Sequence, residues 1–235
     1  MPDFSRRSYQ KELLDRDDIP FKDILRNMTE LDNINKLLGG HAITCSGLAA
    51  IIKVASKAPD HEWNICEIGC GNGNNLAVLY NWCRKHKINA KLTGIDINPH
   101  CIAAADPGKS GPESAFIASD YRQVVFEHKP DIIFSSLFCH HFTDDEMVDQ
   151  LQWLRNNSSV AFFINDLHRN IFAFYSIRVL SRLFSKSYLV KNDAPLSVLR
   201  GFTRFEWMRL MQRSGIDNFS VKWKWAFRWL VVVVT

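Results

Sequence analysis

The chain changes its pattern of apolar and polar positions near residue 59. Before that point, apolar side chains recur three and four residues apart, which predicts helical structure over 6–38 with a break at Pro20, and a second helix over 44–57. After it, short apolar runs that suit buried strands alternate with helical patterns. Such alternation indicates βαβ units, in which helices cover both faces of a parallel sheet.

The last two strand-like runs differ from the others. Only Ala226 and Phe227 separate them, and a two-residue connection permits an antiparallel hairpin but not a parallel crossover. We therefore predict an α/β fold with a doubly wound, mostly parallel seven-stranded sheet, a terminal antiparallel hairpin and an N-terminal helical cap over 1–58, followed by the main domain over 59–235. The strands are expected at 63–68, 90–98, 113–120, 131–138, 159–167, 219–225 and 228–234.

Composition limits the choice of partners and compartment. Hydrophobic residues make up 46% of the chain, which is enough for a full core, and the formal net charge of +4 is too small to argue for a nucleic-acid partner. The six cysteines form no C-x-x-C pair, so we expect buried thiols in a reducing, cytoplasmic environment. The first residues lack the apolar core of a signal peptide, and no apolar run approaches the length of a membrane span.

A glycine-rich stretch, EIGCGNG at 67–73, follows the first predicted strand and precedes a helical pattern. Gly69 and Gly71 would let the backbone turn sharply and approach a ligand without a Cβ in the way. The dinucleotide fingerprint would need a glycine where Asn74 stands, and the Gly-Lys-Ser/Thr ending of a phosphate loop is missing. Glu67, ahead of the glycines, suits a positively charged ligand better than a pyrophosphate. A tight turn without any ligand is the alternative.

Acidic residues end the next two predicted strands. Asp96 could accept hydrogen bonds from two vicinal ribose hydroxyls, and Asp120 could accept one from an exocyclic adenine amine. Because the carboxyl ends of parallel strands meet in one crevice, Glu67, Asp96 and Asp120 are expected to face a shared ligand there. Each acid taken alone could equally be a helix cap.

The segments EIGCGNG, GIDIN, ASDY and DIIFSSLFCHHF resemble those of class I S-adenosylmethionine-dependent methyltransferases, and the resemblance extends over residues 60–235. It implies a Rossmann-like methyltransferase fold, S-adenosyl-L-methionine as cofactor and S-adenosyl-L-homocysteine as product. We expect Glu67 to orient the loop backbone beside the methionine rather than touch it. By the resemblance, the residues bordering the cofactor are Glu67, Gly69, Cys70 and Gly71 at the methionine, Asp96 at the ribose, Ile97, Asp120 and Tyr121 at the adenine, and Ser136 and Leu137 after the fourth strand.

Methyl transfer to a hydroxyl needs a group that takes up its proton, so bases are sought on the loops after the fourth and fifth strands. His140 and His141 follow the fourth strand; the plain alternative is that one packs and the other is exposed. His168 lies in the cluster NDLHRN after the fifth strand. No metal site is expected, since further ligands at suitable spacing are missing. We assign His141 and His168 as candidate catalytic bases, and His140, Asp166, Arg169 and Arg200 as candidate substrate-binding residues.

The segment 168–202 is expected to cap the substrate. Its apolar run at 171–185 favours an apolar or aromatic acceptor, with ordinary packing on the sheet and a helix resting on a membrane as alternatives. INKLLGGHAIT, NDLHRN and KNDAPLSVLRGFT resemble, more loosely, bacterial methyltransferases found beside polyketide synthases, which implies a phenolic or enolic hydroxyl as acceptor. That resemblance also places His41 in a lid and 21–38 in a helical cap over the site.

The predicted function is therefore S-adenosylmethionine-dependent methylation of a small molecule, most simply O-methylation, with C-methylation left open. We expect no nucleic-acid partner and leave weak contact with a membrane surface open. A nucleic-acid or protein methyltransferase is the first alternative, but the fourth strand carries SSLF where amino-directed enzymes commonly have Asn or Asp, two prolines and an aromatic residue. A cofactor-binding protein without catalysis is the second, because acids and glycines cannot show turnover.

Overall fold

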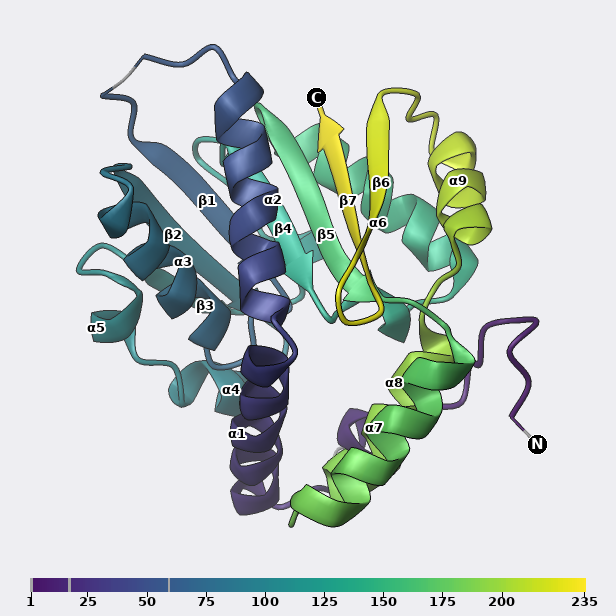
Figure 1. Ribbon diagram of the computed structural model, residues 1–235. Coiled ribbons are helices and arrows are strands. Elements are labelled where there is room, and N and C mark those ends of the chain that lie inside the picture. The colour runs from purple at the N-terminus through teal and green to yellow at the C-terminus, as the bar shows by residue number, and fades with distance from the viewer. Residues whose placement is uncertain (1, 17, 59) are drawn as a thin grey trace.

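The computed structural model describes residues 2–16, 18–58 and 60–235, so the expected domain boundary at 59 lies outside the described residues. Within them lies a sheet of seven strands: β1 (Trp63–Ile68), β2 (Ala90–Asp96), β3 (Ala115–Ala118), β4 (Ile132–Ser136), β5 (Ala161–Leu167), β6 (Phe219–Lys224) and β7 (Arg228–Val234). Their order is β3-β2-β1-β4-β5-β7-β6 (Figure 1). The first five pair in parallel, and β7 pairs antiparallel with β5 and β6, so the predicted topology is confirmed.

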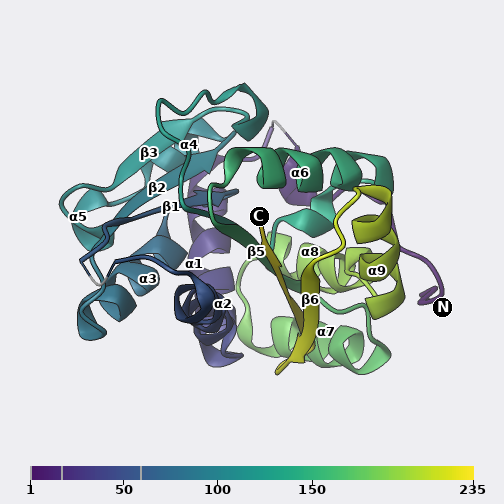
Figure 2. The ribbon, with the colours of Figure 1, turned by 90° about the horizontal axis from the view of Figure 1, so that it is seen from above.

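Helices cover both faces of this sheet (Figure 2). On one face lie α2 (Gly40–Val54) and α3 (Asn74–Lys85), and on the other lie α6 (Asp144–Asn157) and α9 (Arg204–Arg213). Successive strand residues point to opposite faces, so a strand such as β5 feeds both cores. Large apolar side chains fill them, among them Leu48, Leu76 and Phe163 on the first face and Leu151, Phe162 and Trp207 on the second.

The closing hairpin differs from its prediction in the length of its turn. Strand β6 ends at Lys224, which is the last residue to pair with β7, so the three residues 225–227 form the connection instead of two. The strands nevertheless remain antiparallel neighbours, because three residues are still far too few for a parallel crossover. The topology inferred from the short connection therefore holds.

The described part of the segment that precedes α1 (Phe21–Leu37) is mostly extended, which corrects the helical structure predicted before Pro20. The helix predicted after Pro20, up to 38, is confirmed as α1. In the described part of this segment, regular structure is limited to the 3-10 turn η1 (Leu13–Asp15). The N–H groups of Leu13 and Leu14 donate to the carboxylate of Asp193 at 2.8 and 3.0 Å. The backbone is thus satisfied by long-range partners rather than by helical bonds, and periodicity along the sequence cannot reveal such partners.

Arg7 anchors this extended segment to the body of the protein. Its guanidinium donates to Asp144 and to the carbonyl of Phe142, both at 2.8 Å, and lies 4.0 Å from the centroid of the Phe202 ring. Asp144 is the first residue of α6. The N-terminal segment therefore braces the loop that connects β4 to α6.

Residues 168–202, the expected substrate cap, form α7 (Ile171–Phe184) and α8 (Tyr188–Arg200), which pack on each other (Figure 1). In the part of the chain that the structure describes, no single helix is long and apolar enough for a membrane span; α1 and α2 reach that length only as a pair bent by 67°. All six cysteines are buried and free, as expected. The remaining short elements are α4 (Pro99–Ala103), α5 (Pro107–Ser110), η2 (Tyr121–Gln123) and η3 (Cys139–His141).

Arg169 after β5 forms a buried ion pair that ties distant segments together. Its guanidinium donates to the two carboxylate oxygens of Glu206 at 2.7 and 2.9 Å. It also donates to the carbonyls of Gly201 and Phe4 at 2.7 and 3.0 Å. One side chain thus joins the end of β5 to the N-terminal segment, the end of α8 and the first turn of α9.

We expect Arg169→Met to lower the free energy of unfolding by about 3–5 kcal/mol, because the change leaves Glu206 buried without its cationic partner. Urea unfolding followed by circular dichroism measures the loss. Arg213→Met, which removes an arginine paired with Asp145 on the surface, is the matched control and should leave the midpoint unchanged. Equal midpoints for both variants would contradict a stabilising role for the buried pair.

Candidate active site

The loop after β1 needs glycine at two positions. Gly69 has a φ of +68°, and a Cβ there would lie 2.3 Å from the ring of Phe138. Gly71 has a φ of +55°, and its N–H donates to Asp96 at the end of β2 at 2.8 Å. Asp96 also accepts a hydrogen bond from the N–H of Asn98 at 2.9 Å. The loop therefore has a backbone shape that side chains disfavour, and Asp96 holds that shape.

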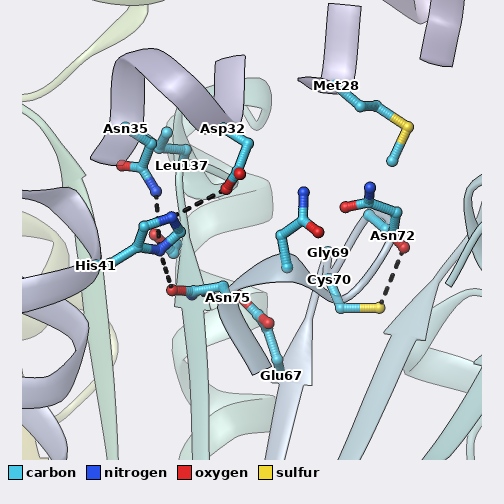
Figure 3. A pocket seen from close by; sticks show the side chains of 13 residues that line it. Met28, Asp32, Asn35, His41, Glu67, Gly69, Cys70, Asn72, Asn75 and Leu137 are labelled. Carbon is cyan, nitrogen blue, oxygen red and sulfur yellow. Dashed lines mark hydrogen bonds and ion pairs between the residues drawn. The ribbon is translucent and has the colours of Figure 1, made fainter. Parts of the chain in front are cut away.

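A cavity of about 150 Å³, the loop cavity, opens on these glycines (Figure 3). Predicted cofactor residues that line it are Glu67, Gly69, Cys70, Gly71, Ser136 and Leu137. Helices α1, α2 and α3 and the loop before α3 complete it with residues that the sequence analysis did not assign to the cofactor: Met28, Asp32, Asn35, His41, Asn72, Asn74 and Asn75. The expected helical cap over 21–38 thus contributes one wall.

Glu67 is buried at the end of β1. Its Oε1 accepts a hydrogen bond from Asn75 Nδ2 at 2.7 Å, while its Oε2 has no hydrogen-bond partner among the described residues. Burial raises its pKa to about 8. In the described residues Glu67 makes no hydrogen bond to the loop backbone, and its contact with Asn75 in the first turn of α3 is its link to the end of the loop. A buried carboxyl oxygen left free at a cavity suits a ligand with positive charge.

His41 connects three walls of the loop cavity (Figure 3). Its Nε2 lies 2.9 Å from Asp32, and its Nδ1 lies 3.1 Å from Asn75 and 3.4 Å from Asn35. His41 was expected in a lid, and the structure places it instead in the first turn of α2, at the wall of the cavity. A signal for this wall exists in the sequence: Met28, Asp32 and Asn35 are spaced as on one face of a helix.

The predicted ribose and adenine residues lie outside the loop cavity. Ile97 is 70% exposed, and Asp120 is paired with Arg122, which lowers the pKa of Asp120. Tyr121 is buried in the core, where its hydroxyl accepts a hydrogen bond from Gln150 at 3.3 Å. The side chain of Tyr121 is therefore not free to bind an adenine edge, which corrects that assignment, whereas the roles of Asp96, Ile97 and Asp120 stay predictions.

A larger cavity of about 400 Å³, the apolar cavity, adjoins the first and shares Asn35 and Leu137 with it. Leu137 follows β4 with a φ of +55°, a conformation that non-glycine residues rarely adopt. The fold thus holds one strained residue where the two cavities meet. Apolar side chains dominate the wall: Leu14, Leu31, Ile34, Leu38, Leu167, Ala173, Ile177, Leu180, Ala194, Val198, Trp225, Ala226 and Phe227.

Part of the apolar cavity is polar, and we call Glu12, His140 and His141 the polar corner. Nδ1 of His140 lies 2.7 Å from Asp166, and Nδ1 of His141 lies 3.3 Å from Asp15. The two Nε2 atoms lie 3.7 and 3.9 Å from the carboxylate oxygens of Glu12. A carboxylate on the Nδ1 side therefore orients each imidazole, and each Nε2 is turned toward Glu12.

The electrostatics of the polar corner favour protonated imidazole at His141. Burial lowers the pKa of His141, but the hydrogen bond to Asp15 and the charges of Glu12 and Asp15 outweigh it, so the pKa lies above the usual 6.5. The ligand atoms of Glu12, His140 and His141 lie within 4.8 Å of one another, which is close enough for a divalent cation. The polar corner is therefore the place where the expectation that no metal binds can be tested.

The loop after β5 supplies one predicted residue to the polar corner and directs another away from it. Asp166 is fully buried and acts through the ring of His140, so its expected contact with substrate is corrected to an orienting role. His168 is not among the described residues that line either cavity, and its ring packs 4.9 Å from that of Trp229. His168 is therefore not placed to act as the base.

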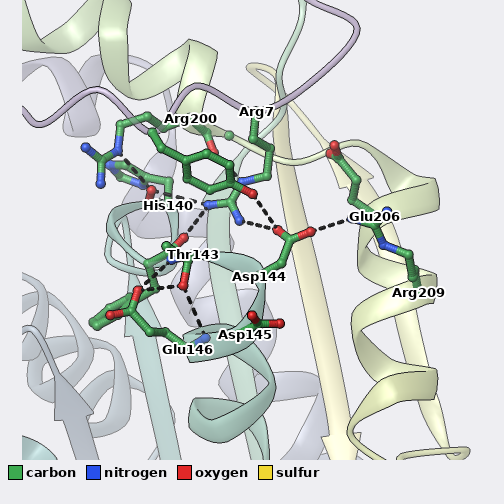
Figure 4. A network of polar contacts seen from close by, with 12 residues as sticks. Arg7, His140, Thr143, Asp144, Asp145, Glu146, Arg200, Glu206 and Arg209 are labelled. Atoms are coloured by element: carbon green, nitrogen blue, oxygen red, sulfur yellow. Dashed lines mark hydrogen bonds and ion pairs between the residues drawn. The ribbon is translucent and has the colours of Figure 1, made fainter.

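Two arginines expected to bind substrate are occupied by the protein itself. Arg200 donates to the carbonyl of His140 at 3.0 Å (Figure 4). It also donates to the carbonyl of His141 at 2.7 Å, and so holds η3 in place. Arg169 is committed to Glu206. Neither lines the loop cavity or the apolar cavity, so the structure contradicts both assignments. Spacing along the sequence cannot show whether an arginine will find partners within the protein.

Comparison with known proteins shows which proteins this chain resembles. Residues 65–157 match the family model of a methyltransferase domain. Trans-aconitate 2-methyltransferase of Enterobacter sp. (strain 638) is 34% identical over 83 residues, which are 35% of this chain and 31% of that protein. The enzyme of the same name from Escherichia coli O1:K1 / APEC is 37% identical over 73 residues, 31% of this chain and 26% of that protein. The aligned part is thus less than a third of either relative.

Solved structures share the fold over most of the chain. The plantazolicin methyltransferase BpumL in complex with S-adenosylhomocysteine aligns with a TM-score of 0.64 and 18% identity, over 87% of this chain and 88% of that one. Magnesium protoporphyrin IX methyltransferase from Synechocystis PCC 6803 aligns with a TM-score of 0.55 and 13% identity, over 92% and 99%. Residues 65–157 thus match a methyltransferase domain, and the chain has the fold of these solved S-adenosylmethionine-dependent methyltransferases. The free carboxyl oxygen of Glu67 and the glycine backbone fit the cationic methionine end of that cofactor.

We expect Glu67→Gln to weaken the binding of S-adenosylmethionine and to flatten its pH dependence. Below its pKa of about 8 the carboxyl is protonated, so a cationic ligand must displace a proton, and the affinity of the wild type should rise as pH increases toward about 9. Titration calorimetry in buffers of different ionisation enthalpy measures both effects. Asp106→Asn, at the exposed start of α5, is the control. An unchanged pH profile in Glu67→Gln would exclude contact with the cationic group.

Proposed function

We propose that this chain transfers the methyl group of S-adenosylmethionine to the hydroxyl oxygen of a small, apolar acceptor of phenolic or enolic type. The observation that carries the proposal is the pair of cavities that meet at Asn35 and Leu137. An in-line displacement needs the nucleophile, the methyl carbon and the sulfur on one line, so acceptor and cofactor must approach each other across such a junction. The mostly apolar wall of the larger cavity favours an acceptor with an apolar body.

In this reaction the acceptor oxygen bonds to the methyl carbon, the bond from that carbon to sulfur breaks, and the hydroxyl proton must leave. We assign the proton to His141, whose Nδ1 is held by Asp15 and whose ring borders the apolar cavity. His140, held by Asp166, binds the acceptor hydroxyl beside it. The polar corner thus serves proton removal and orientation together.

The relatives support a small acceptor without specifying it. The curated relatives are named for trans-aconitate, and the solved structures are named for plantazolicin and magnesium protoporphyrin IX. A nucleic-acid acceptor is disfavoured, because the apolar cavity offers apolar side chains where a polyanion would need a basic groove.

The test of this function is mass spectrometry of host extracts and of a panel of phenols, each incubated with the purified chain and isotopically labelled S-adenosylmethionine. A labelled methyl ether of a small phenol or enol is the expected product. Label in protein or nucleic acid would replace the proposal with that alternative. Tight cofactor binding without any labelled product would favour the alternative of a cofactor-binding protein without catalysis.

His141→Ala is expected to lower kcat by about 10²–10⁴-fold with little change in cofactor affinity, because it removes the base and leaves the loop cavity intact. Single-turnover assays and calorimetry separate the two effects. His168→Ala is the matched control and should retain the kcat of the wild type. Loss of activity on treatment with EDTA, with recovery on adding zinc or magnesium, would contradict a metal-free base and locate a cation at the polar corner.

The pH dependence of kcat provides an independent check on His141. A base works in its neutral form, so kcat should fall as pH decreases through the pKa of His141, which Asp15 and Glu12 hold above 6.5. Asp15→Asn removes a hydrogen bond and a charge that raise this pKa, so the acid limb should move to lower pH. Stopped assays across the pH range measure the limb. If the acid limb of kcat does not move in Asp15→Asn, a group other than His141 causes the fall in kcat.

A further inference from the structure

Arg228, the first residue of β7, is a buried guanidinium without a counter-ion in the described residues. Its side chain borders the apolar cavity, and the residue is only 3% exposed. Its Nε and Nη1 have no hydrogen-bond partner among the residues that the structure describes. Asp166 is the acid whose charge acts on it, but Asp166 already accepts hydrogen bonds from His140 Nδ1 and the N–H of Leu167, both at 2.7 Å.

The other buried arginines show that this protein normally pairs such groups. Arg7, Arg169 and Arg200 each donate to carboxylates or carbonyls at hydrogen-bond distance. An unpaired charge is costly to bury, and burial accordingly lowers the pKa of Arg228 to about 10. Arg228 is thus a cation placed at a cavity wall that the protein itself does not neutralise.

A second feature at the same place also favours an anion. A Cβ on Gly40 would lie 3.1 Å from Cζ of Arg228 and 1.7 Å from Oδ1 of Asn35, so the guanidinium lies against the first residue of α2 and beside the residue shared by both cavities. The N–H groups at the start of this 15-residue helix carry the positive end of its dipole. A helix N-terminus together with a guanidinium favours a carboxylate.

We propose that Arg228 and the N-terminus of α2 form a carboxylate-binding site at the junction of the two cavities. Two molecules could supply that carboxylate: the cofactor, through the carboxylate of its methionine end, or an acceptor that carries an acid group besides its hydroxyl. If the acceptor supplies the carboxylate, the proposal rests on the proposed function; if the cofactor supplies it, the proposal does not. The planar guanidinium can donate two parallel hydrogen bonds to one carboxylate, which a lysine cannot do.

The experiment compares Arg228→Met and Arg228→Lys with the wild type in two arms. In the first, calorimetry measures the affinity of S-adenosylmethionine and of its decarboxylated analogue. In the second, kcat and KM are measured for phenol and hydroxybenzoate acceptors that differ only in the carboxylate. For one pair of ligands, Arg228→Met should bind the carboxylated member about 10–100-fold more weakly, seen as a lower affinity or a higher KM, and should bind the other member as the wild type does. Arg228→Lys should show a smaller loss.

The arm that responds identifies the source of the carboxylate. Equal effects on carboxylated and decarboxylated partners in both arms would overturn the site. Arg213→Met is the control for loss of a surface arginine. Thermal melting of the ligand-free variants adds a further check: Arg228→Met should melt at or above the wild type, because it removes an unpaired buried charge, and a clear drop would show a structural partner instead. Failure of the proposed function alone would appear as no turnover of any acceptor, while the calorimetric arm still reports on Arg228.

Discussion

The candidate site depends on one constraint, which is that neighbouring parallel strands end at the same edge of their sheet. The loops after β1, β2, β4 and β5 all emerge there, so Glu67, Asp96, Leu137 and His140 are brought together although they are widely separated in the chain. Helices α1 and α2 then cover that edge and divide the space above it. The loop cavity and the apolar cavity are neighbours at this edge, and they meet where Leu137 adopts its unusual backbone conformation.

Around this edge the protein satisfies most of its buried charges internally. Arg7, Arg169 and Arg200 hold the N-terminal segment, α9 and η3 in place, and this bracing positions the polar corner without touching a ligand. Glu67 and Arg228 are the contrasting cases, because each keeps a buried polar atom without a partner in the described residues. Those two side chains border different cavities and carry opposite charge in their ionised forms. We interpret this difference as a separation between groups that maintain the fold and groups that are available to cofactor or acceptor.

The sequence predicted the sheet, its closing hairpin and the glycine loop because those signals are local. Alternation of apolar runs follows from burial on both faces, and Gly69 and Gly71 stand where φ is positive. The choice between candidate polar residues failed more often: Arg169 and Arg200 proved to be structural, and His168 lies outside the cavities. Glu12 was missed altogether, since it comes from a segment that was expected to be helical and lies far from His140 in the chain.

Composition, periodicity and short motifs therefore determine which fold this chain adopts and where its glycine loop lies, because each arises from neighbouring residues acting through backbone geometry and burial. Tertiary structure alone decided which charged side chains face a cavity and which are neutralised within the protein. The physical reason is that the cost of a buried charge depends on partners that can lie more than a hundred residues away, as Arg7 and Asp144 do. Periodicity carries no information about such distant partners, so the three-dimensional arrangement is needed to separate His141 from His168.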